Sequence, residues 1–394
     1  MASISALLSI TLILVFGAVK MFSQRTLKPE FFLILGTLCI VLFIAVCCKN
    51  KSVVMFSDDI EYYYLEKNIA SIYYSPDNIL YAGDVSSGDL YRSTDGGIAW
   101  ETVFRIENRI GTIRCVFISN SGTIFVSRGK SGELKRSGNK GKTFETCLKL
   151  SNNASVVWGM AENRKGWLYA AEYSNIDQEE RCAYIYRSKN DGKDWVNIYH
   201  DPNARHFHFI AVDPYTGYIY AASGDGPKKA SLIRSADDGD SWVTLGNKNL
   251  DPKIDWQFTS VVFTPKYRIF GEDEPPQSDI VRTADDIHFE KVLIPDGPER
   301  HNFWSWGRID KRGNILFGSY TQHAALRKEM EGVSATANGV IFLSRDEGTT
   351  WKKVVDFGLR EDHSGTHFAS NVKEGSWIYC HMEEDGKSLK IRVK

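Results

Sequence analysis

The chain has 394 residues, a hydrophobic fraction of 43%, a charged fraction of 25% and a formal net charge of −1 at pH 7. These fractions are typical of a globular protein and exclude a disordered one. The near-zero charge provides no overall field that would attract nucleic acid, so nucleic-acid binding is excluded as well. With 10 Trp, 18 Tyr and 21 Phe, the composition favours a β-rich fold.

Two uncharged apolar runs open the chain, over residues 4–19 and 31–48. With their flanks, as helices of about 4–22 and 31–48, both are long enough to cross a hydrocarbon core of roughly 30 Å. A short polar linker joins them, which predicts a transmembrane hairpin within residues 1–50. The alternative for the first run is a cleaved signal peptide, but no Lys or Arg precedes it. We therefore expect a multi-pass membrane protein whose two helices are anchored in the lipid bilayer.

Positive charges beside these runs indicate the orientation of the hairpin. Lys20, Arg25 and Lys28 lie in the linker region, whereas Lys49 and Lys51 follow the second run. This three-to-two difference favours a cytosolic linker. The rest of the chain is then expected to be extracytoplasmic.

The cysteines outside the apolar runs form no recognisable motif. Their spacing matches no zinc or redox pattern, and two disulfides or none remain open. These cysteines are Cys115, Cys147, Cys182 and Cys380. Neither a metal site nor a cofactor is predicted.

One octapeptide pattern, Ser-x-Asp/Asn-x-Gly-x-x-Trp/Phe, recurs through the remainder of the chain. Its copies start 44, 51, 47, 48 and 61 residues apart, a period that belongs to propeller blades. The residue types suit a tight turn, because Asp or Asn can bond to nearby amides and Gly supplies a positive φ. The five full copies begin at Ser93, Ser137, Ser188, Ser235 and Ser344, and a decayed copy covers residues 283–290.

The third and eighth residues of each full copy are predicted to be structural: the third closes the turn and the eighth packs under the blade. These pairs are Asp95 and Trp100, Asn139 and Phe144, Asn190 and Trp195, Asp237 and Trp242, and Asp346 and Trp351.

These octapeptides resemble the Asp boxes of BNR-repeat proteins, the sialidase-like superfamily. The resemblance covers roughly residues 60–394 and implies a β-propeller in which the boxes are structural. The Arg-Ile-Pro motif of sialidases precedes their first box, whereas here the nearest match, Phe104-Arg105-Ile106-Glu107, follows the first box and lacks the Pro. No catalytic role is therefore carried over from the family.

Seven strand-rich units follow one another, and the seventh lacks both a box and a fourth strand. The tyrosine-rich segment Asp59–Glu66 is predicted to supply that strand and close the ring. We expect an all-β, seven-bladed propeller over residues 52–394, with six blades as the alternative. The units begin near Ile69, Thr112, Val156, Phe207, Phe258, Phe303 and Thr366.

The functional site is predicted on the face opposite the boxes, where innermost strands start and second strands end. Carboxylates there could act as acid and base on a glycosidic bond, and aromatic, Arg and His side chains suit sugar rings. Polar residues also gather at solvated strand ends without any ligand. The catalytic candidates are Glu172, Asp225 and Asp273. The ligand-binding candidates are Arg114, Arg128, His206, Trp256, Trp304, Tyr320, His367 and His381.

Two functions follow from this organisation. The first is an extracytoplasmic propeller that binds or processes a glycan. The alternative is a non-enzymatic scaffold that docks a protein partner in a membrane complex. An enzyme should show convergent carboxylates in a concave pocket, whereas a scaffold should show a more apolar surface.

Overall fold

The computed structural model divides the chain into two compact units, Met1–Lys51 and Ser52–Lys394. The predicted hairpin of residues 1–50 lies outside the described residues. No helix in the described part of the chain is long and apolar enough to cross a bilayer. The described ranges are 54–84, 87–105, 112–129, 131–174, 182–224, 230–273, 279–292, 294, 307–321, 339–357, 364–368, 377–382 and 387–394.

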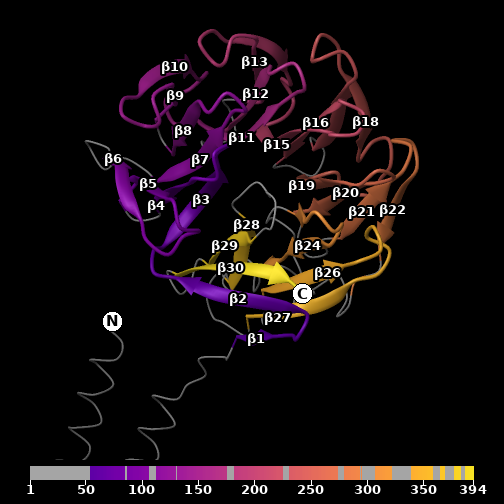
Figure 1. Cartoon of the computed structure of the whole chain (residues 1–394). Helices are drawn as coiled ribbons and strands as arrows, with labels where there is room; N and C mark the ends of the chain where they lie inside the picture. Colours follow the sequence, from indigo (N-terminus) through magenta and orange to yellow (C-terminus); the bar gives the residue numbers. More distant parts are fainter. Residues whose placement is uncertain are drawn as a thin grey trace, which may run out of the picture. The chain divides into compact units, whose positions relative to one another are not determined.

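Within these ranges, seven antiparallel sheets are arranged as blades around a central axis (Figure 1). Each of the first five blades consists of four strands in chain order. The first blade contains β3 (Ile69–Tyr74), β4 (Leu80–Asp84), β5 (Leu90–Ser93) and β6 (Glu101–Phe104), and the second contains β7 (Ile113–Ile118), β8 (Ile124–Arg128), β9 (Glu133–Ser137) and β10 (Glu145–Lys149). The third contains β11 (Val156–Glu162), β12 (Leu168–Tyr173), β13 (Tyr184–Ser188) and β14 (Val196–His200), and the fourth contains β15 (His206–Val212), β16 (Ile219–Gly224), β17 (Ser231–Ser235) and β18 (Val243–Asn247). The fifth contains β19 (Phe258–Phe263), β20 (Arg268–Glu272), β21 (Ile280–Thr283) and β22 (Phe289–Val292).

The sixth and seventh blades each recruit a strand from the start of the described chain. In the sixth, β1 (Met55–Phe56) pairs with the outer strand β27, and in the seventh, β2 (Ile60–Leu65) pairs with β30. The other strands of the sixth blade are β23 (Arg308–Ile309), β24 (Ile315–Gly318), β26 (Val340–Ser344) and β27 (Lys352–Asp356). Those of the seventh blade are β28 (Ser364–Phe368), β29 (Ile378–Met382) and β30 (Lys387–Val393), with β25 (Tyr320–Thr321) paired beside β28.

The pairing of β2 with β30 closes the ring. Ile60 lies opposite Val393 and Leu65 lies opposite Ser388, so the pairing runs the full length of β2. This confirms both the seven blades and the predicted closing segment Asp59–Glu66, and it excludes the six-bladed alternative.

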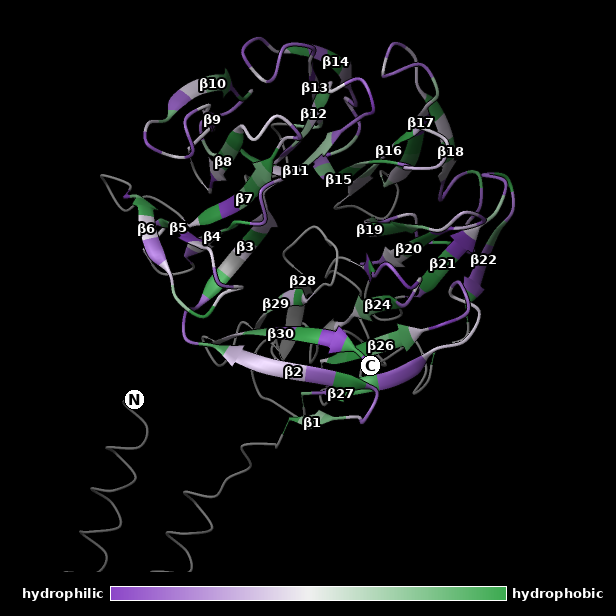
Figure 2. Ribbon diagram, in the orientation of Figure 1, coloured by the Kyte–Doolittle hydropathy of each residue, from purple (hydrophilic) through white to green (hydrophobic). Residues whose placement is uncertain are grey.

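The core consists of apolar layers between neighbouring blades. Between the fourth and fifth blades, for example, the rings of Phe209 on β15 and Phe270 on β20 are stacked with centroids 6.5 Å apart, and both side chains are buried. Figure 2 shows the complementary pattern, in which the outer strand β22 is mainly hydrophilic. Burial of apolar area between blades, at roughly 25 cal/mol per Å², is what holds the ring together.

The box turns join the third and fourth strands of a blade, as predicted. In the first, the Asp95 carboxylate accepts hydrogen bonds from the amides of Ile98 (3.0 Å) and Ala99 (2.9 Å) and from the Ser93 hydroxyl (2.7 Å). Asp237 and Asp346 bond within their own turns in the same way. These contacts confirm the predicted closing role of the third box residue.

Burial of the box tryptophans is less uniform than expected. Trp351 is buried, with 7% of its surface exposed, whereas Trp100, Trp195 and Trp242 are half-buried. A half-buried indole packs one ring face under the blade and leaves the other edge near solvent. Trp351 is therefore the box tryptophan that contributes most to the core.

The fourth residue of a box turn links neighbouring blades. Asp191 accepts hydrogen bonds from Ser119 (3.0 Å) and Ser121 (2.8 Å), which lie in the turn between the first two strands of the preceding blade. In the next blade, Asp238 accepts one from Asn163 at 2.8 Å in the equivalent turn. The box turns and the turns that follow the innermost strands therefore lie on the same face, which we call the box face.

Candidate functional site

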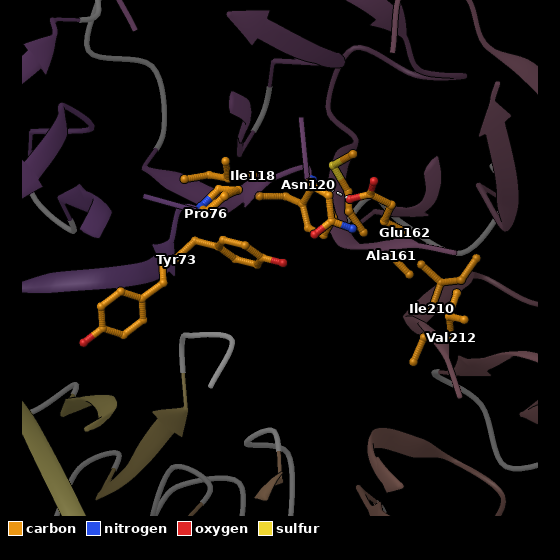
Figure 3. A pocket seen from close by; sticks show the side chains of 12 residues that line it. Tyr73, Pro76, Ile118, Asn120, Ala161, Glu162, Ile210 and Val212 are labelled. Carbon is orange, nitrogen blue, oxygen red and sulfur yellow. Dashed lines mark hydrogen bonds between the residues drawn. The ribbon is translucent and has the colours of Figure 1, made fainter. Parts of the chain in front are cut away.

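A cavity of about 620 Å³ lies at the box-face end of the central channel. Its lining comes from the last residues of the innermost strands of the first four blades, β3, β7, β11 and β15, and from the turns that follow them (Figure 3). The volume falls within the range of about 300–1,000 Å³ that is usual for ligand sites.

Most residues that line this cavity are aromatic or aliphatic, but the surface that they expose to it is mainly polar. Asn120 and Glu162 lie next to each other in Figure 3, and the backbone amide of Asn120 donates to the Glu162 carboxylate at 2.7 Å. Burial raises the pKa of Glu162. The apolar part is formed by Tyr73, Tyr74, Pro76, Phe117, Ile118, Met160, Ala161, Ile210, Ala211 and Val212.

A second cavity of about 230 Å³ continues deeper along the channel. It shares five lining residues with the first: Tyr73, Phe117, Met160, Ile210 and Ala211. We call the two together the axial funnel. Its deep part adds Arg308 and hydroxyl residues of β3 and β19, and the surface exposed to the funnel is mainly polar at the mouth and mainly apolar deeper in.

On the face opposite the boxes, aromatic and cationic side chains form a continuous stack. The Arg114 guanidinium lies 6.0 Å from the centre of the Trp158 ring, and that ring stacks on Tyr173 at 4.5 Å. Tyr173 in turn stacks on His206 at 3.8 Å. Arg114 is exposed and Trp158 is half-buried, so only this end of the stack reaches solvent.

The two histidines at the inner end of the stack are hydrogen-bonded to each other. The Nε2 atoms of His206 and His208 are 3.1 Å apart, and His206 Nδ1 lies 2.6 Å from the carbonyl oxygen of Ser174. A carbonyl can only accept, so neutral His206 donates from Nδ1 and accepts at Nε2, where His208 donates. Both imidazoles are buried, which makes them a structural pair.

Two of the three residues predicted to be catalytic lie in the described part of the chain, and both are buried. Glu172 is fully buried and accepts hydrogen bonds from the Tyr186 hydroxyl (2.8 Å) and from the hydroxyl (2.6 Å) and amide (3.2 Å) of Ser151. Asp273 is 9% exposed, and its backbone is bonded to Gln257. Asp225 lies outside the described residues.

Four predicted ligand-binding residues have described side chains, which lie in different surroundings. Arg114 belongs to the exposed stack, and His206 is buried at the other end of it. Arg128 is half-buried at the end of β8. Trp256 is 2% exposed and packs in the core between the fourth and fifth blades, with its indole N–H donating to the carbonyl of Asp251 at 2.8 Å.

The other predicted ligand-binding residues are described only in part. Trp304 lies outside the described residues. For Tyr320, His367 and His381 only the backbone is described, where His367 pairs with His381 and Tyr320 pairs with Gly365. Their roles as ligand-binding residues stay predictions.

Sequence reasoning missed the axial funnel because its residues lie at the opposite ends of the innermost strands. The missed signal is a repeated one: Tyr73, Phe117, Met160 and Ile210 occupy similar positions near the ends of β3, β7, β11 and β15. Large apolar side chains at the same inner-strand position in successive blades converge on the axis. That position would have identified the funnel.

Comparison with known proteins supports the fold and goes no further. No protein-family model and no curated protein matches the sequence. Among solved structures, the chain is similar to a catalytically inactive virginiamycin B lyase from Staphylococcus aureus with quinupristin, with a TM-score of 0.60 and 13% identity over 85% of this chain and 100% of that one. It is similar to YCF48 bound to a D1 peptide, with a TM-score of 0.58 and 13% identity over 86% of this chain and 97% of that one. It is also similar to an ancestral GH74 enzyme, with a TM-score of 0.52 and 16% identity over 74% of this chain and 40% of that one.

These similarities define the class of protein: a seven-bladed β-propeller. At 10–16% identity, such propellers include lyases, a glycoside hydrolase and proteins solved with peptide or protein partners. The class therefore leaves the activity of this chain to be inferred from its own residues.

Proposed function

We propose that this chain is a non-enzymatic binding protein whose axial funnel takes up an apolar segment of a protein partner. The observation that carries the proposal is the deep part of the funnel, a cavity of about 230 Å³ whose exposed surface is mainly apolar and includes Phe117, Met160 and Ile210. Such a surface gains free energy by covering apolar groups.

The state of Glu172 supports binding over glycan catalysis. A general acid or base must reach the reacting atom within hydrogen-bond distance. Glu172 is fully buried and already accepts three hydrogen bonds from Tyr186 and Ser151. A catalytic role would require these contacts to break.

A filled-funnel variant tests this function in the full-length chain, reconstituted in lipid nanodiscs. Ala211 lines both parts of the funnel, so Ala211→Phe should occupy the space that a ligand needs. Ala236 is exposed in the box turn of the fourth blade and provides the matched control Ala236→Phe.

We expect labelled apolar hexapeptides to bind the parent and Ala236→Phe equally, and Ala211→Phe at least tenfold more weakly with an unchanged Tm. A glycan array is probed in parallel. Glycan binding without peptide binding would overturn the proposal.

A second candidate function is glycan binding on the face opposite the boxes. The observation that favours it is the exposed Arg114 beside the half-buried ring of Trp158, because sugar rings stack on such rings while guanidinium groups bond to hydroxyls. Trp158→Ala should then abolish glycan binding and leave peptide binding at the funnel unchanged.

We also propose that residues 1–50 anchor the propeller in the membrane and that the propeller lies outside the cytoplasm. The support is the two uncharged runs and the three-to-two difference in positive charge around them. Protease added to intact cells should then digest the propeller. Digestion only after lysis would place the propeller in the cytosol.

A further inference from the structure

The mouth of the axial funnel carries a carboxylate that no cation neutralises. Of the twelve described residues that line this cavity of about 620 Å³, Glu162, the last residue of β11, is the one with a charged side chain. Its carboxylate accepts from the amide of Asn120 at 2.7 Å, and no cationic side chain in the described ranges pairs with it. Burial and the nearby carboxylate of Asp191 both raise the pKa of Glu162. Both effects favour a positive charge at this position.

The two cations that follow Glu162 in the sequence are directed to the fourth blade. Arg164 donates to the carbonyl of Tyr215 at 3.3 Å, and Lys165 Nζ lies 2.5 Å from the carboxylate of Asp238. Taking a carboxylate out of water without a counter-ion costs free energy. A ligand that brings the missing positive charge into the mouth therefore gains from Glu162.

A buried hydroxyl group without a partner lies deeper in the funnel. Ser260 on β19 is 2% exposed, and its Oγ has no hydrogen-bond partner among the described residues. Buried hydroxyls are nearly always bonded, so this one indicates a position where a polar group of a ligand completes the contact. A peptide backbone supplies such groups, both N–H and C=O.

We propose that the axial funnel recognises a cationic amine on the bound segment, held at the mouth by the carboxylate of Glu162. This inference rests on the proposed function and specifies its ligand, in which apolar groups lie at depth and one amine lies at the mouth. The Asn120 amide already occupies Oε2 of Glu162. A compact ammonium, which needs one oxygen, therefore fits better than a guanidinium, which pairs best with both.

The position of Glu162 beside an apolar side chain suits a lysine in particular. Met160 lines both parts of the funnel and lies two residues before Glu162 on β11, beyond the bulge of that strand. Residues two apart point to the same side of a strand, roughly 6.6 Å from each other. The carbon stem of a lysine can cover Met160 while its ammonium reaches the Glu162 carboxylate.

The amine can come from a lysine side chain or from a chain terminus, and three hexapeptide pools distinguish these sources. All are otherwise apolar and amidated at the C-terminus. The first is N-acetylated and contains one Lys, the second has a free α-amino group with norleucine in place of Lys, and the third is N-acetylated with norleucine. Binding to the full-length chain in nanodiscs is measured by fluorescence anisotropy at pH 7.

We expect the first or the second pool to bind at least fivefold more tightly than the third. Glu162→Gln, which keeps an acceptor for the Asn120 amide, should reduce that binding to the level of the third pool. Ser260→Ala should instead weaken all three pools alike, two- to fivefold, because it removes a contact to the backbone. Glu290, 59% exposed on the outer strand β22, provides the control Glu290→Gln, which should leave the preference unchanged.

The outcomes separate this inference from the function on which it rests. Equal binding of all three pools to the parent, lost in Ala211→Phe, would overturn the amine site and leave the binding function intact. A preference that persists in Glu162→Gln would show that another group holds the amine. Binding of none of the pools would overturn both proposals. If Glu162→Gln fails to fold, the pools are compared on Glu162→Asp, where the withdrawn carboxylate should reduce the preference at least twofold and an undiminished one would overturn the site.

Discussion

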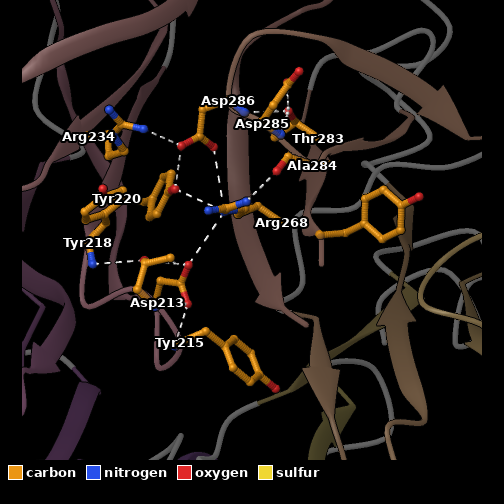
Figure 4. A network of polar contacts seen from close by, with 12 residues as sticks. Asp213, Tyr215, Tyr218, Tyr220, Arg234, Arg268, Thr283, Ala284, Asp285 and Asp286 are labelled. Carbon is orange, nitrogen blue, oxygen red and sulfur yellow. Dashed lines mark hydrogen bonds and ion pairs between the residues drawn. The ribbon is translucent and has the colours of Figure 1, made fainter. Parts of the chain in front are cut away.

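The carboxylate of Asp286 lies in the polar network that joins the fourth and fifth blades (Figure 4). It is 6% exposed, accepts a hydrogen bond from the Tyr220 hydroxyl at 2.8 Å and pairs with Arg234 at 2.6 Å. Arg268 lies 3.7 Å from Asp286 and 3.6 Å from Asp213, so the guanidinium connects two buried carboxylates. Each charge in this network depends on its partners, because the site is shielded from water.

Asp286→Asn should destabilise the propeller by about 3 kcal/mol, since it removes the buried anion that the half-buried Arg234 and Arg268 share. Glu290→Gln is the control: Glu290 pairs with Arg282 on the outer strand β22 and its side chain is 59% exposed, so its loss should cost less than about 1 kcal/mol. Urea unfolding measures both. Equal losses would show that the network contributes no more than a surface pair.

Glu272 should make stability depend on pH. Burial raises its pKa from 4.5 to about 7. The folded state therefore holds a proton that the unfolded state releases between these values, so the contribution of Glu272 to stability is greatest below about pH 4.5 and falls as pH rises to about 7. Through this titration the free energy of unfolding changes by at most about 3 kcal/mol.

Glu272→Gln removes this titration. Its unfolding free energy relative to the parent should rise by up to that amount between pH 4.5 and pH 7 and stay constant above pH 7. Urea titrations at half-unit intervals measure the difference. A difference that is the same at every pH would show that Glu272 does not titrate in this range.

Individual site residues were harder to predict than strands, because burial depends on register. From the sequence, Glu172, Asp225 and Asp273 were all predicted to lie at the ends of second strands, at equivalent positions of three blades. In the structure, Glu172 pairs with Val157, and the equivalent positions in the next two blades are Ser223 and Glu272.

At the scale of elements, a β-bulge recurs in the innermost strands. The register shifts near the start of β11, between Val157 and Gly159, and at the same place in β15, between Phe207 and Phe209. A bulge inserts one unpaired residue and changes which side chains face the axis. Its position is set by pairing with the second strand, so the sequence of one strand alone does not reveal it.

The box turns show the opposite case, in which local sequence was sufficient. Ser, Asp and Gly at fixed spacing define the turn by bonds within the octapeptide, as in Ser344, whose Oγ accepts from the Gly348 amide at 2.9 Å. No distant residue is needed for that geometry. The turn was therefore predictable, whereas the burial of its tryptophan, which depends on the neighbouring blade, was predictable only in part.

Trp351→Ala should cost about 3–5 kcal/mol, because the indole is buried and packs against Phe317 with ring centres 5.6 Å apart. Trp242→Ala is the matched comparison. Its indole is half-buried, so it should cost roughly half as much. Chemical denaturation of both variants measures the difference, and the reverse order would show that exposure does not govern the contribution of these tryptophans.

For the whole molecule, the number of blades followed from counting units and finding one strand missing. The tyrosine-rich strand β2 supplies it through pairing with β30, across a sequence distance that only ring closure explains. The axial funnel is a property of the same scale. It needs strands from at least four blades in one ring, so no local motif could predict it.

Opening the ring should be costly. A proline at position 62 or 63 of β2 removes a backbone N–H and distorts the strand that pairs with β30. The more sensitive of the variants Tyr62→Pro and Tyr63→Pro should therefore lose about 3 kcal/mol or more of unfolding free energy. Tyr62→Thr and Tyr63→Thr keep the backbone and serve as controls. Limited proteolysis with thermal unfolding measures the effect. Proline variants as stable as the threonine variants would mean that the closing strand is dispensable.

The pairing of β2 with β30 also has a consequence for biosynthesis. A ribosome makes β2 early and β30 more than 300 residues later, so throughout translation the nascent chain carries an edge strand without its partner. Tyr62, Tyr63 and Tyr64 are still exposed in the finished propeller, and in the nascent chain the backbone beside them is open to other strands. We therefore expect that edge to be open to wrong strand pairing until Lys387–Val393 has been made and can pair with it.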